Sequence, residues 1–457
     1  MKRFFSDYLT ERHSKKNKKP LIVNGARQVG KTYVIEEFAR QNFDDYIKIN
    51  FEETPELKEY FKTNDVIEIK QNLEVYFGKK IIPGKTLLFI DEIQACPEAI
   101  VTLRYFYEKL PGIDVITAGS LLDHTLNNLK YSMPVGRVEF AYLTPMNFYE
   151  FLSALSETAI LDFLKNYKLE KEIPLPLHQK ILKILRLYFF IGGMPQAVKA
   201  YLENNSLKDV EIVHESILKS LQYDFAKYGT RSQQEVLIGL LKYLPNSIGK
   251  KFKYTNAIPE MRVENTKRAL ELLKLSRIVN IVYSTDANGI PLESEINQKV
   301  FKPIFLDIGL ANHLLKLRLQ KIEDLITVNE GNLAEQFIGQ QLLSLEPFYL
   351  EKQIYYWARE KRNSSAEIDF VTEYNGMIIP IEVKAGKTGT LKSLHIFMKE
   401  KKMKYALRFN TDIALTTQVN NEMKIGNNVT EIEYKLISLP LYLILEHQRI
   451  FENRENV

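Results

Sequence analysis

Eight residues near the N-terminus constrain the fold of this chain more than any other feature. The stretch GARQVGKT follows the pattern G-x-x-x-x-G-K-[ST], with the apolar run PLIVNG before it and the amphipathic run TYVIEEFAR after it. A glycine-rich loop between a strand and a helix lets the backbone wrap closely around phosphate oxygens, and its N–H groups and the helix N-terminus attract negative charge. The sequence therefore predicts a P-loop that cradles the phosphates of a nucleotide.

In this prediction the whole loop binds ATP. Lys31 places its cation between the β- and γ-phosphates, and the Thr32 hydroxyl is a ligand of Mg²⁺, which prefers oxygen ligands. The predicted ATP-binding residues are Gly25, Ala26, Arg27, Gln28, Val29, Gly30, Lys31 and Thr32. A glycine turn that matches the pattern by chance is the alternative, and a second motif argues against it.

The second motif is LLFIDEIQ, an apolar run that ends in Asp91 and Glu92. Acids at the carboxyl end of a buried parallel strand lie at the edge of the sheet where ligands bind. We expect Asp91 to hold Mg²⁺ through water and Glu92 to act as the base that polarises the attacking water. Taken alone, the pair would be interpreted by default as a strand that ends in a solvated acidic cap, and the P-loop beside it argues against that interpretation.

Strands and helices alternate between residues 19 and 146. Short runs rich in β-branched residues, separated mostly by helical stretches, indicate an α/β fold with a parallel sheet and helices on both faces. The expected strands are PLIVNG, DYIKINF, TLLFIDE, DVITAGS and VEFAYL. This part is expected to be a P-loop NTPase domain covering residues 1–155.

Two further residues are candidates for the hydrolysis site. Ser120 ends the run DVITAGS, where its hydroxyl could contact the γ-phosphate or the attacking water. Arg137, in PVGRVEF, could neutralise developing charge on its own chain's nucleotide or on that of a neighbour in a homo-oligomer. Arg104 is a weaker candidate. The alternatives are a serine that caps a strand and an arginine that lies on the surface.

The rest of the chain is expected to form two more regions. Residues 147–230 read as mostly helical, and residues 233–307 read as two helices followed by two strands, an order that suggests a winged helix. From about residue 328 the pattern is again helix, strands and helix. We therefore expect a helical and winged-helix region over residues 156–320 and a separate α/β domain with its own core over residues 321–457.

A second group of acids lies near the C-terminus. EIDF carries Asp369, and IEVK carries Glu382 and Lys384 on one strand face, beyond a turn at Asn375-Gly376. Two carboxylates and a lysine that face together form a Mg²⁺ site suited to phosphodiester hydrolysis, with Asp369 and Glu382 as ligands. Glu335, on the preceding helix, adds another carboxylate. Acid–lysine pairs are also common on solvated strand faces.

These motifs resemble a family of bacterial AAA-like P-loop ATPases with a C-terminal domain of unknown function. The resemblance rests on GARQVGKT, DEIQ, TAGS and LTPMNFYEF, and further on GGMPQAV, YDFAKY, FLDIGL and IDFV with IEVKAG. The C-terminal acids resemble the D…E-x-K signature of the restriction-endonuclease-like, or PD-(D/E)XK, fold. Asp369, Glu382 and Lys384 match that signature, and Glu335 matches its upstream helix acid. The resemblance implies an ATPase domain, a winged-helix middle and a nuclease-like end.

Charge and composition limit the partners. The net charge of +5 is a weak excess, so a nucleic-acid surface must be a local patch. Lysines and arginines cluster on and before the second helix of the winged-helix region, which suggests DNA contacts, although glutamates interrupt them. The residues are Lys250, Lys251, Lys253, Arg262, Lys267, Arg268 and Lys274. One cysteine and the absence of a long apolar run favour a cytoplasmic protein without a membrane segment.

Two functions remain open from the sequence. In the first, a Mg²⁺-dependent ATPase couples hydrolysis to DNA binding or processing by the nuclease-like domain. In the second, the P-loop is a nucleotide switch, and the C-terminal fold binds DNA or a protein without cutting, because fold does not fix function.

Overall fold

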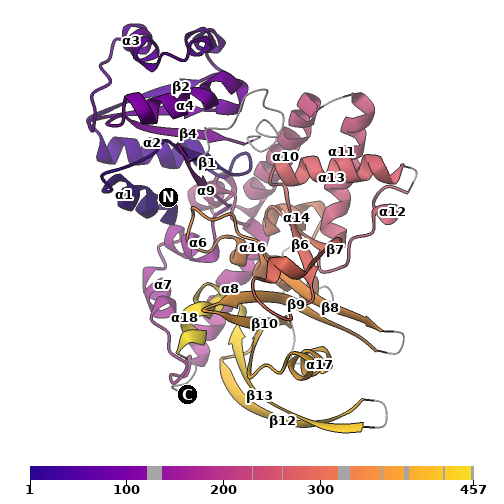
Figure 1. Ribbon diagram of the computed structural model, residues 1–457. Coiled ribbons are helices and arrows are strands. Elements are labelled where there is room, and N and C mark those ends of the chain that lie inside the picture. Colours follow the sequence, from indigo (N-terminus) through magenta and orange to yellow (C-terminus); the bar gives the residue numbers. More distant parts are fainter. Residues whose placement is uncertain are drawn as a thin grey trace. The chain divides into compact units, whose positions relative to one another are not determined.

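The computed structural model describes most of the chain, and the described residues divide into two compact units. The described residues are 1–120, 136–228, 230–259, 261–317, 330–361, 364–384, 391–425 and 428–453. The first unit comprises Met1–Met146, Glu271–Ile278 and Glu346–Glu351. The second unit comprises Asn147–Leu270, Val279–Leu345 and Lys352–Val457. Figure 1 shows the chain coloured along its sequence.

The first unit is built on a five-stranded sheet in the order β2-β3-β4-β1-β5, and every neighbouring pair is parallel. Its strands are β1 (Leu21–Asn24), β2 (Asp45–Asn50), β3 (Thr86–Asp91), β4 (Asp114–Gly119) and β5 (Glu139–Tyr142). All five strands predicted from the sequence are confirmed. In register, Asn24 lies beside Gly119 and Tyr142, and Asn50 lies beside Asp91, so the strand ends that carry the motifs meet at one edge.

Helices cover this sheet. They are α1 (Phe4–His13), α2 (Lys31–Asn42), α3 (Val66–Phe77) and α4 (Pro97–Lys109), with short 3₁₀ turns η1 (Pro55–Lys62) and η2 (Ile93–Ala95). Alternate sheet residues such as Ile47, Ile49 and Ile90 form one core cluster with α3 and α4. That cluster contains no α2 residue, and α2 lies across the sheet from α4 (Figure 1). Alternation along each strand therefore buries both faces of the sheet.

The second unit begins with a helical part that comprises α6 (Phe148–Ala154), α7 (Thr158–Lys165), α8 (Leu175–Ile191), α9 (Pro195–Asn204), α10 (Leu207–Asp224), α11 (Arg231–Tyr243) and α12 (Tyr254–Ala257). α13 (Val263–Leu275) follows, and its residues from Glu271 belong to the first unit. The later helices are α14 (Ile308–Leu314), α16 (Glu330–Leu343), α17 (Lys392–Lys401) and α18 (His447–Glu452). Local sequence sets several ends. Asn147 and Glu150 form a capping box at the start of α6, and α8 ends at Gly192 with a φ of 73°.

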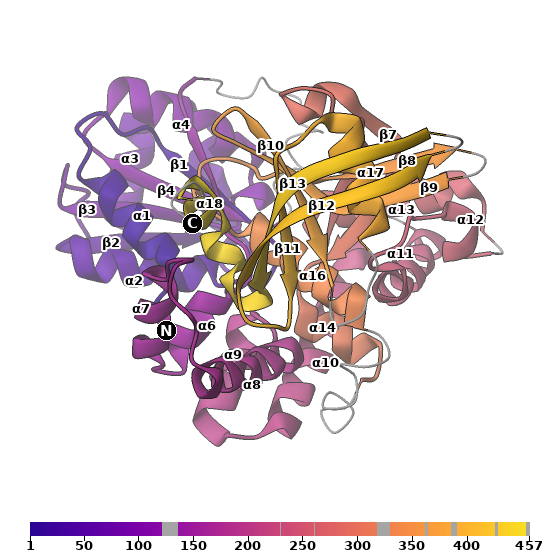
Figure 2. The same cartoon turned by 90° about the horizontal axis from the view of Figure 1, so that it is seen from below.

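An eight-stranded mixed sheet completes the second unit, in the order β12-β13-β11-β10-β9-β8-β6-β7. Its strands are β6 (Val279–Thr285), β7 (Ile296–Phe305), β8 (Tyr355–Lys361), β9 (Ser364–Tyr374), β10 (Met377–Val383), β11 (Tyr405–Asn410), β12 (Leu415–Ile425) and β13 (Asn428–Pro440). Figure 2 shows the long pair β12 and β13 running side by side.

This sheet differs from the arrangement expected from the sequence. The two strands predicted for a wing do pair with each other as β6 and β7, but β6 also pairs with β8. β6 and β7 therefore extend the sheet formed by β8 to β13, so the C-terminal strands share one sheet with the two predicted wing strands. The expected boundary at residues 320–321 lies outside the described residues. The winged helix and the three-domain division stay predictions.

Within the described residues, no single helix is long and apolar enough to cross a bilayer. One bent pair, α8 with α9, meets the length and composition criteria when its two helices are taken together, with an angle of 118° between them.

Candidate functional site

The P-loop has the backbone shape that its glycines were expected to give. A Cβ on Gly25 would lie 2.3 Å from the carbonyl oxygen of Leu143, so only glycine fits there. Gly30 has a φ of 94° and forms the N-cap of α2, and Gln28 has a φ of 65°. Alternating left- and right-handed residues turn successive N–H groups to one side, which is the geometry of an anion-binding nest.

Lys31 is buried against the loop itself. Its Nζ donates to the carbonyl oxygens of Gly25 and Ala26, both at 2.8 Å, and the residue is 7% exposed. Burial lowers the pKa of Lys31 to about 8, although the nearby Glu92 and Asp91 charges act in the opposite direction. A buried ammonium held by two carbonyls is a cation that gains free energy when an anion arrives.

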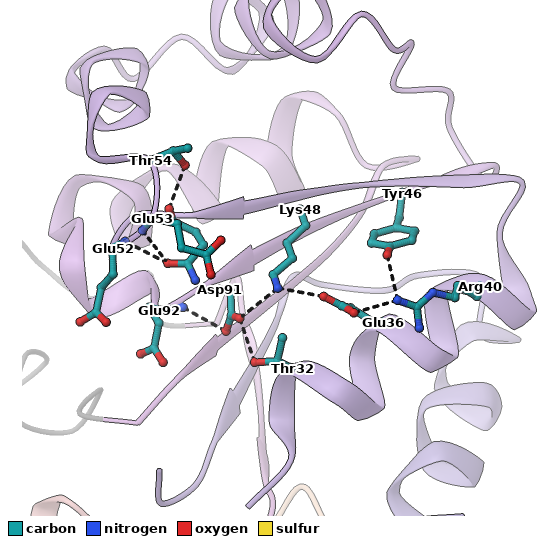
Figure 3. Close-up of polar contacts among 11 residues, drawn as sticks. Thr32, Glu36, Arg40, Tyr46, Lys48, Glu52, Glu53, Thr54, Asp91 and Glu92 are labelled. Atoms are coloured by element: carbon teal, nitrogen blue, oxygen red, sulfur yellow. Dashed lines mark hydrogen bonds and ion pairs between the residues drawn. The ribbon is translucent and has the colours of Figure 1, made fainter. Parts of the chain in front are cut away.

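The two motifs meet directly (Figure 3). Thr32 Oγ1 donates to Asp91 Oδ2 at 2.8 Å, and the Glu92 N–H donates to Asp91 Oδ1 at 3.1 Å. Burial raises the pKa of Asp91, and the hydrogen bond from Thr32 opposes this shift. A hydroxyl and a carboxylate side by side at the sheet edge are oxygen donors of the type that Mg²⁺ prefers, so these residues fit the predicted ion.

Glu92 has a strained backbone. Its φ of 49° and ψ of 44° are left-handed, which costs a residue with a Cβ about 1 kcal/mol. The Glu92 carboxylate accepts a hydrogen bond from the Gln94 side chain. Strain of this kind collects at functional sites, where the surrounding structure enforces it.

The other two predicted residues lie at opposite edges of the sheet. Ser120 is buried and follows Gly119, which pairs with Asn24, so it lies beside the start of the P-loop. Arg137 precedes Glu139, which pairs with Leu21 at the amino-terminal edge. There its Nε is 2.9 Å from Glu108 Oε1 on α4.

Arg104 shares the Glu108 carboxylate, with its Nε 3.0 Å from the same oxygen. Arg104 and Arg137 are therefore both paired with the same acid of α4.

Sequence reasoning missed three cations at the correct edge. Lys48, on β2, lies 3.9 Å from Asp91 Oδ2 and 2.8 Å from Glu36 Oε1 (Figure 3). Arg3, before α1, is buried and donates to the carbonyl oxygens of Val29 at 2.8 Å and Thr144 at 2.7 Å. An isolated lysine or arginine far from a motif carries no local signal, so no sequence pattern indicated either.

The third cation is Arg277, which belongs to the first unit through the segment Glu271–Ile278. Its guanidinium lies 4.8 Å from the ring centroid of Tyr142, whose Cα partner in the sheet is Asn24, the residue before the P-loop. It also pairs with Glu351 at 3.0 Å. The Arg277 charge helps to lower the pKa of Lys31.

In the second unit, the predicted hairpin is confirmed. β9 and β10 are antiparallel, with Tyr374 opposite Met377 across Asn375 and Gly376, which have φ values of 47° and 75°. Positive φ at both central residues is typical of a type I′ turn. Asp369 Oδ2 accepts from the Val383 N–H at 2.7 Å, which fixes its carboxylate beside β10.

The four predicted residues of this region gather in one buried cluster with an unpredicted lysine. Glu382 Oε1 is 2.6 Å from Lys384 Nζ. Lys302 Nζ, from β7, is 3.1 Å from Glu335 Oε2 and 3.9 Å from Asp369 Oδ1. Burial raises the pKa values of Glu335, Asp369 and Glu382, the last to about 7.

The donor set does not fit a metal ion as it stands. Lys302, Lys384 and a backbone N–H already engage one oxygen of Glu335, one of Glu382 and both of Asp369. Among the residues that the structure describes, no three histidine, cysteine, aspartate or glutamate side chains are arranged to hold a metal. The metal-ligand roles of Asp369 and Glu382 stay predictions.

A basic pocket lies in the same unit. It has a volume of about 720 Å³, and Lys250, Lys251, Lys253 and Arg359 contribute to its lining together with Glu367. Glu367 connects the pocket to the acid cluster, because its Oε2 is 3.8 Å from Lys251 and its Oε1 is 2.5 Å from Lys302. Four cations around one carboxylate make the pocket attractive to an anion.

Comparison with known proteins gives family matches for three successive segments of the chain. Residues 17–152 match a family model described as "AAA domain". Residues 182–321 and 330–437 match two models described as domains of unknown function (DUF8612 and DUF4143). No curated protein matches the chain significantly.

Several solved structures are similar at low identity. A Walker-type ATPase of Pyrococcus abyssi shares 16% identity over 68% of this chain and 94% of its own, with a TM-score of 0.43. The ORC2 protein of Aeropyrum pernix shares 12% identity over 70% and 92% of the two chains, with a TM-score of 0.30. The match to an AAA domain model over residues 17–152 agrees with the P-loop geometry of the first unit.

Proposed function

We propose that the first unit hydrolyses ATP with Mg²⁺, and the observation that carries this proposal is the Thr32–Asp91 contact beside the buried Lys31. In this proposal the loop N–H groups and Lys31 bind the phosphates. Thr32 and Asp91 hold Mg²⁺, which supplies charge neutralisation on the phosphate oxygens when bound.

Glu92 acts as the general base. Its carboxylate accepts a proton from water while the water oxygen bonds to the γ-phosphorus and the bond to the β–γ bridging oxygen breaks, which releases ADP and phosphate. Ser120 is proposed to orient this water or the γ-phosphate, in agreement with its place beside the P-loop edge. The left-handed backbone of Glu92 supports a functional constraint at this residue.

We assign the charge-neutralising arginine in the same chain to Arg277 rather than Arg137. Arg277 lies over Tyr142, beside the residue that enters the P-loop, whereas Arg137 pairs with Glu108 at the other edge. Arg137 keeps a role only toward a neighbour's nucleotide in a homo-oligomer, and sedimentation with ATP that shows only monomer would remove it. Arg277→Ala with wild-type turnover would remove Arg277 from the site.

Glu92→Gln tests the chemistry. We expect ATP turnover to fall by about 10²- to 10⁴-fold while ATP binding is kept, because the amide cannot accept the proton. Glu68→Gln, an exposed acid on α3, is the matched control and should behave as wild type. Wild-type turnover by Glu92→Gln would refute the assignment of the base.

We further propose that the second unit binds nucleic acid at the basic pocket. The pocket's lysines and arginine outnumber its single acid, and the neighbouring cluster of Asp369, Glu382 and Lys384 matches a nucleic-acid-processing signature. Cations that contact phosphates release counterions, so binding should weaken steeply with salt.

The charge reversal Lys250→Glu with Lys253→Glu tests this proposal by fluorescence anisotropy with labelled DNA. The slope of log affinity against log salt should become shallower by about 1 to 2. Lys199→Glu, on the exposed face of α9, is the control. If the wild-type chain binds no DNA with or without ATP, the nucleic-acid proposal fails, and the ATPase proposal is unaffected.

A further inference from the structure

The acid cluster of the second unit contains a cation supplied by the chain itself. Lys302 is 3% exposed, and its ammonium lies among oxygens from α16 and β9: Glu335 Oε2 at 3.1 Å, Glu367 Oε1 at 2.5 Å and Asp369 Oδ1 at 3.9 Å. The ring of Tyr356, on β8, completes its surroundings at 5.2 Å from Nζ. Three strands and one helix therefore converge on a single ammonium group.

The surroundings compensate the charge of this lysine. Removing an ammonium from water costs several kcal/mol unless opposite charges compensate it. Here the carboxylates of Glu335, Glu367 and Asp369 and the ring face of Tyr356 surround Lys302 Nζ. Lys302 thus places a positive charge between the acids.

A divalent ion needs the same oxygens. Glu335 and Asp369, which would bind it, are each within 4 Å of Lys302 Nζ. A second cation at that distance from an ammonium meets strong repulsion at the low dielectric of a buried site. The remaining motif acid, Glu382, gives one oxygen to Lys384 at 2.6 Å.

We infer that Lys302 is the resident cation of this cluster and excludes divalent metal ions from it. The cluster then ties β7, α16 and β9 together as a buried ion-pair network, and the second unit can hold a ligand at the adjacent pocket without metal-dependent cutting. This inference stands on the cluster alone and does not require that the pocket binds nucleic acid.

Mn²⁺ binding to the full chain without nucleotide, followed by electron paramagnetic resonance, tests the inference. Wild type should show no Mn²⁺ site that depends on Asp369. Lys302→Met should gain one, with an affinity at least about 100-fold above the detection limit at which wild type shows none, because the buried carboxylates lose their compensating charge. Adding Asp369→Asn should abolish the gained site, and Lys302→Arg, which keeps the charge, should not gain it.

Two results would overturn the inference. The first is a wild-type Mn²⁺ site that Asp369→Asn removes. The second is a folded Lys302→Met chain that gains no Mn²⁺ site, because the absence of metal binding would then not depend on Lys302. If Lys302→Met fails to fold, Lys302→Met with Glu335→Gln removes one acid with the lysine, and the wild-type measurement by itself still provides the refuting result.

Discussion

Raising the pH from 7 to 9 should weaken ATP binding through a single side chain, Lys31. Burial lowers the pKa of its ammonium from 10.5 to about 8 in the nucleotide-free loop. This shift corresponds to about 3 kcal/mol of unfavourable free energy for holding the charge in the loop. The phosphates of ATP provide a compensating negative charge, so we expect the pKa to return toward its ordinary value in the complex.

The direction of the effect follows from which form binds. Protonated Lys31 binds ATP, and the free loop loses that proton as the pH rises through about 8. The affinity should therefore be nearly constant below pH 7 and about tenfold weaker at pH 9 than at pH 7, or about 1.4 kcal/mol. Binding should take up about half a proton at pH 8 and about nine-tenths at pH 9.

Isothermal titration calorimetry measures both quantities. Pairs of buffers with different ionisation enthalpies report the protons taken up at pH 8 and pH 9, where the ATP phosphates are almost fully ionised because their last pKa is about 6 to 7. Circular dichroism at pH 9 controls for unfolding. An ATP affinity that is constant from pH 7 to 9, with equal heats in both buffers, would refute the lowered pKa of the buried Lys31 ammonium.

Two further predictions concern buried positions. Gly25→Ala should weaken ATP binding by at least about tenfold in calorimetry, because the added Cβ would lie 2.3 Å from the Leu143 carbonyl oxygen and distort the loop. The control Gly289→Ala, whose Cβ would have no atom within 4 Å, should bind ATP as wild type does. Asp307, at the start of α14, accepts from the Gly193 N–H at 2.6 Å, and burial raises its pKa to about 6. Because a raised carboxyl pKa stabilises the fold only while the group is protonated, the stability advantage of wild type over Asp307→Asn in urea unfolding should shrink by about 2 kcal/mol from pH 4 to pH 7, and a constant difference would contradict the shift.

Asp307 also explains two of the sequence landmarks. Its side chain caps α14 through the N–H groups of Gly309 and Leu310 and reaches the GGMPQAV turn at Gly193. A Cβ on Gly192 would lie 2.0 Å from Asp307 Oδ1, so the glycine and the aspartate require each other. The sequence showed both motifs but not that they form one contact.

Local pattern by itself determined the first unit and its phosphate loop. The order of apolar strands and helices gave the parallel sheet, and two motifs at strand ends gave Thr32 and Asp91, which are in contact. The hairpin at Asn375-Gly376 was equally readable, because a two-residue turn needs positive φ at positions that favour these residues. In each case the structure is determined by residues that are close together in the sequence.

Only the tertiary structure decided which distant charges join these sites. It brought Arg3, Lys48 and Arg277 to the edge that carries the P-loop and placed Arg137 at the other edge. It also joined β6 and β7 to the C-terminal sheet and thereby put Lys302 among the acids. A single lysine or arginine has no periodicity, and its partner is set by strand order and register, which arise from long-range pairing.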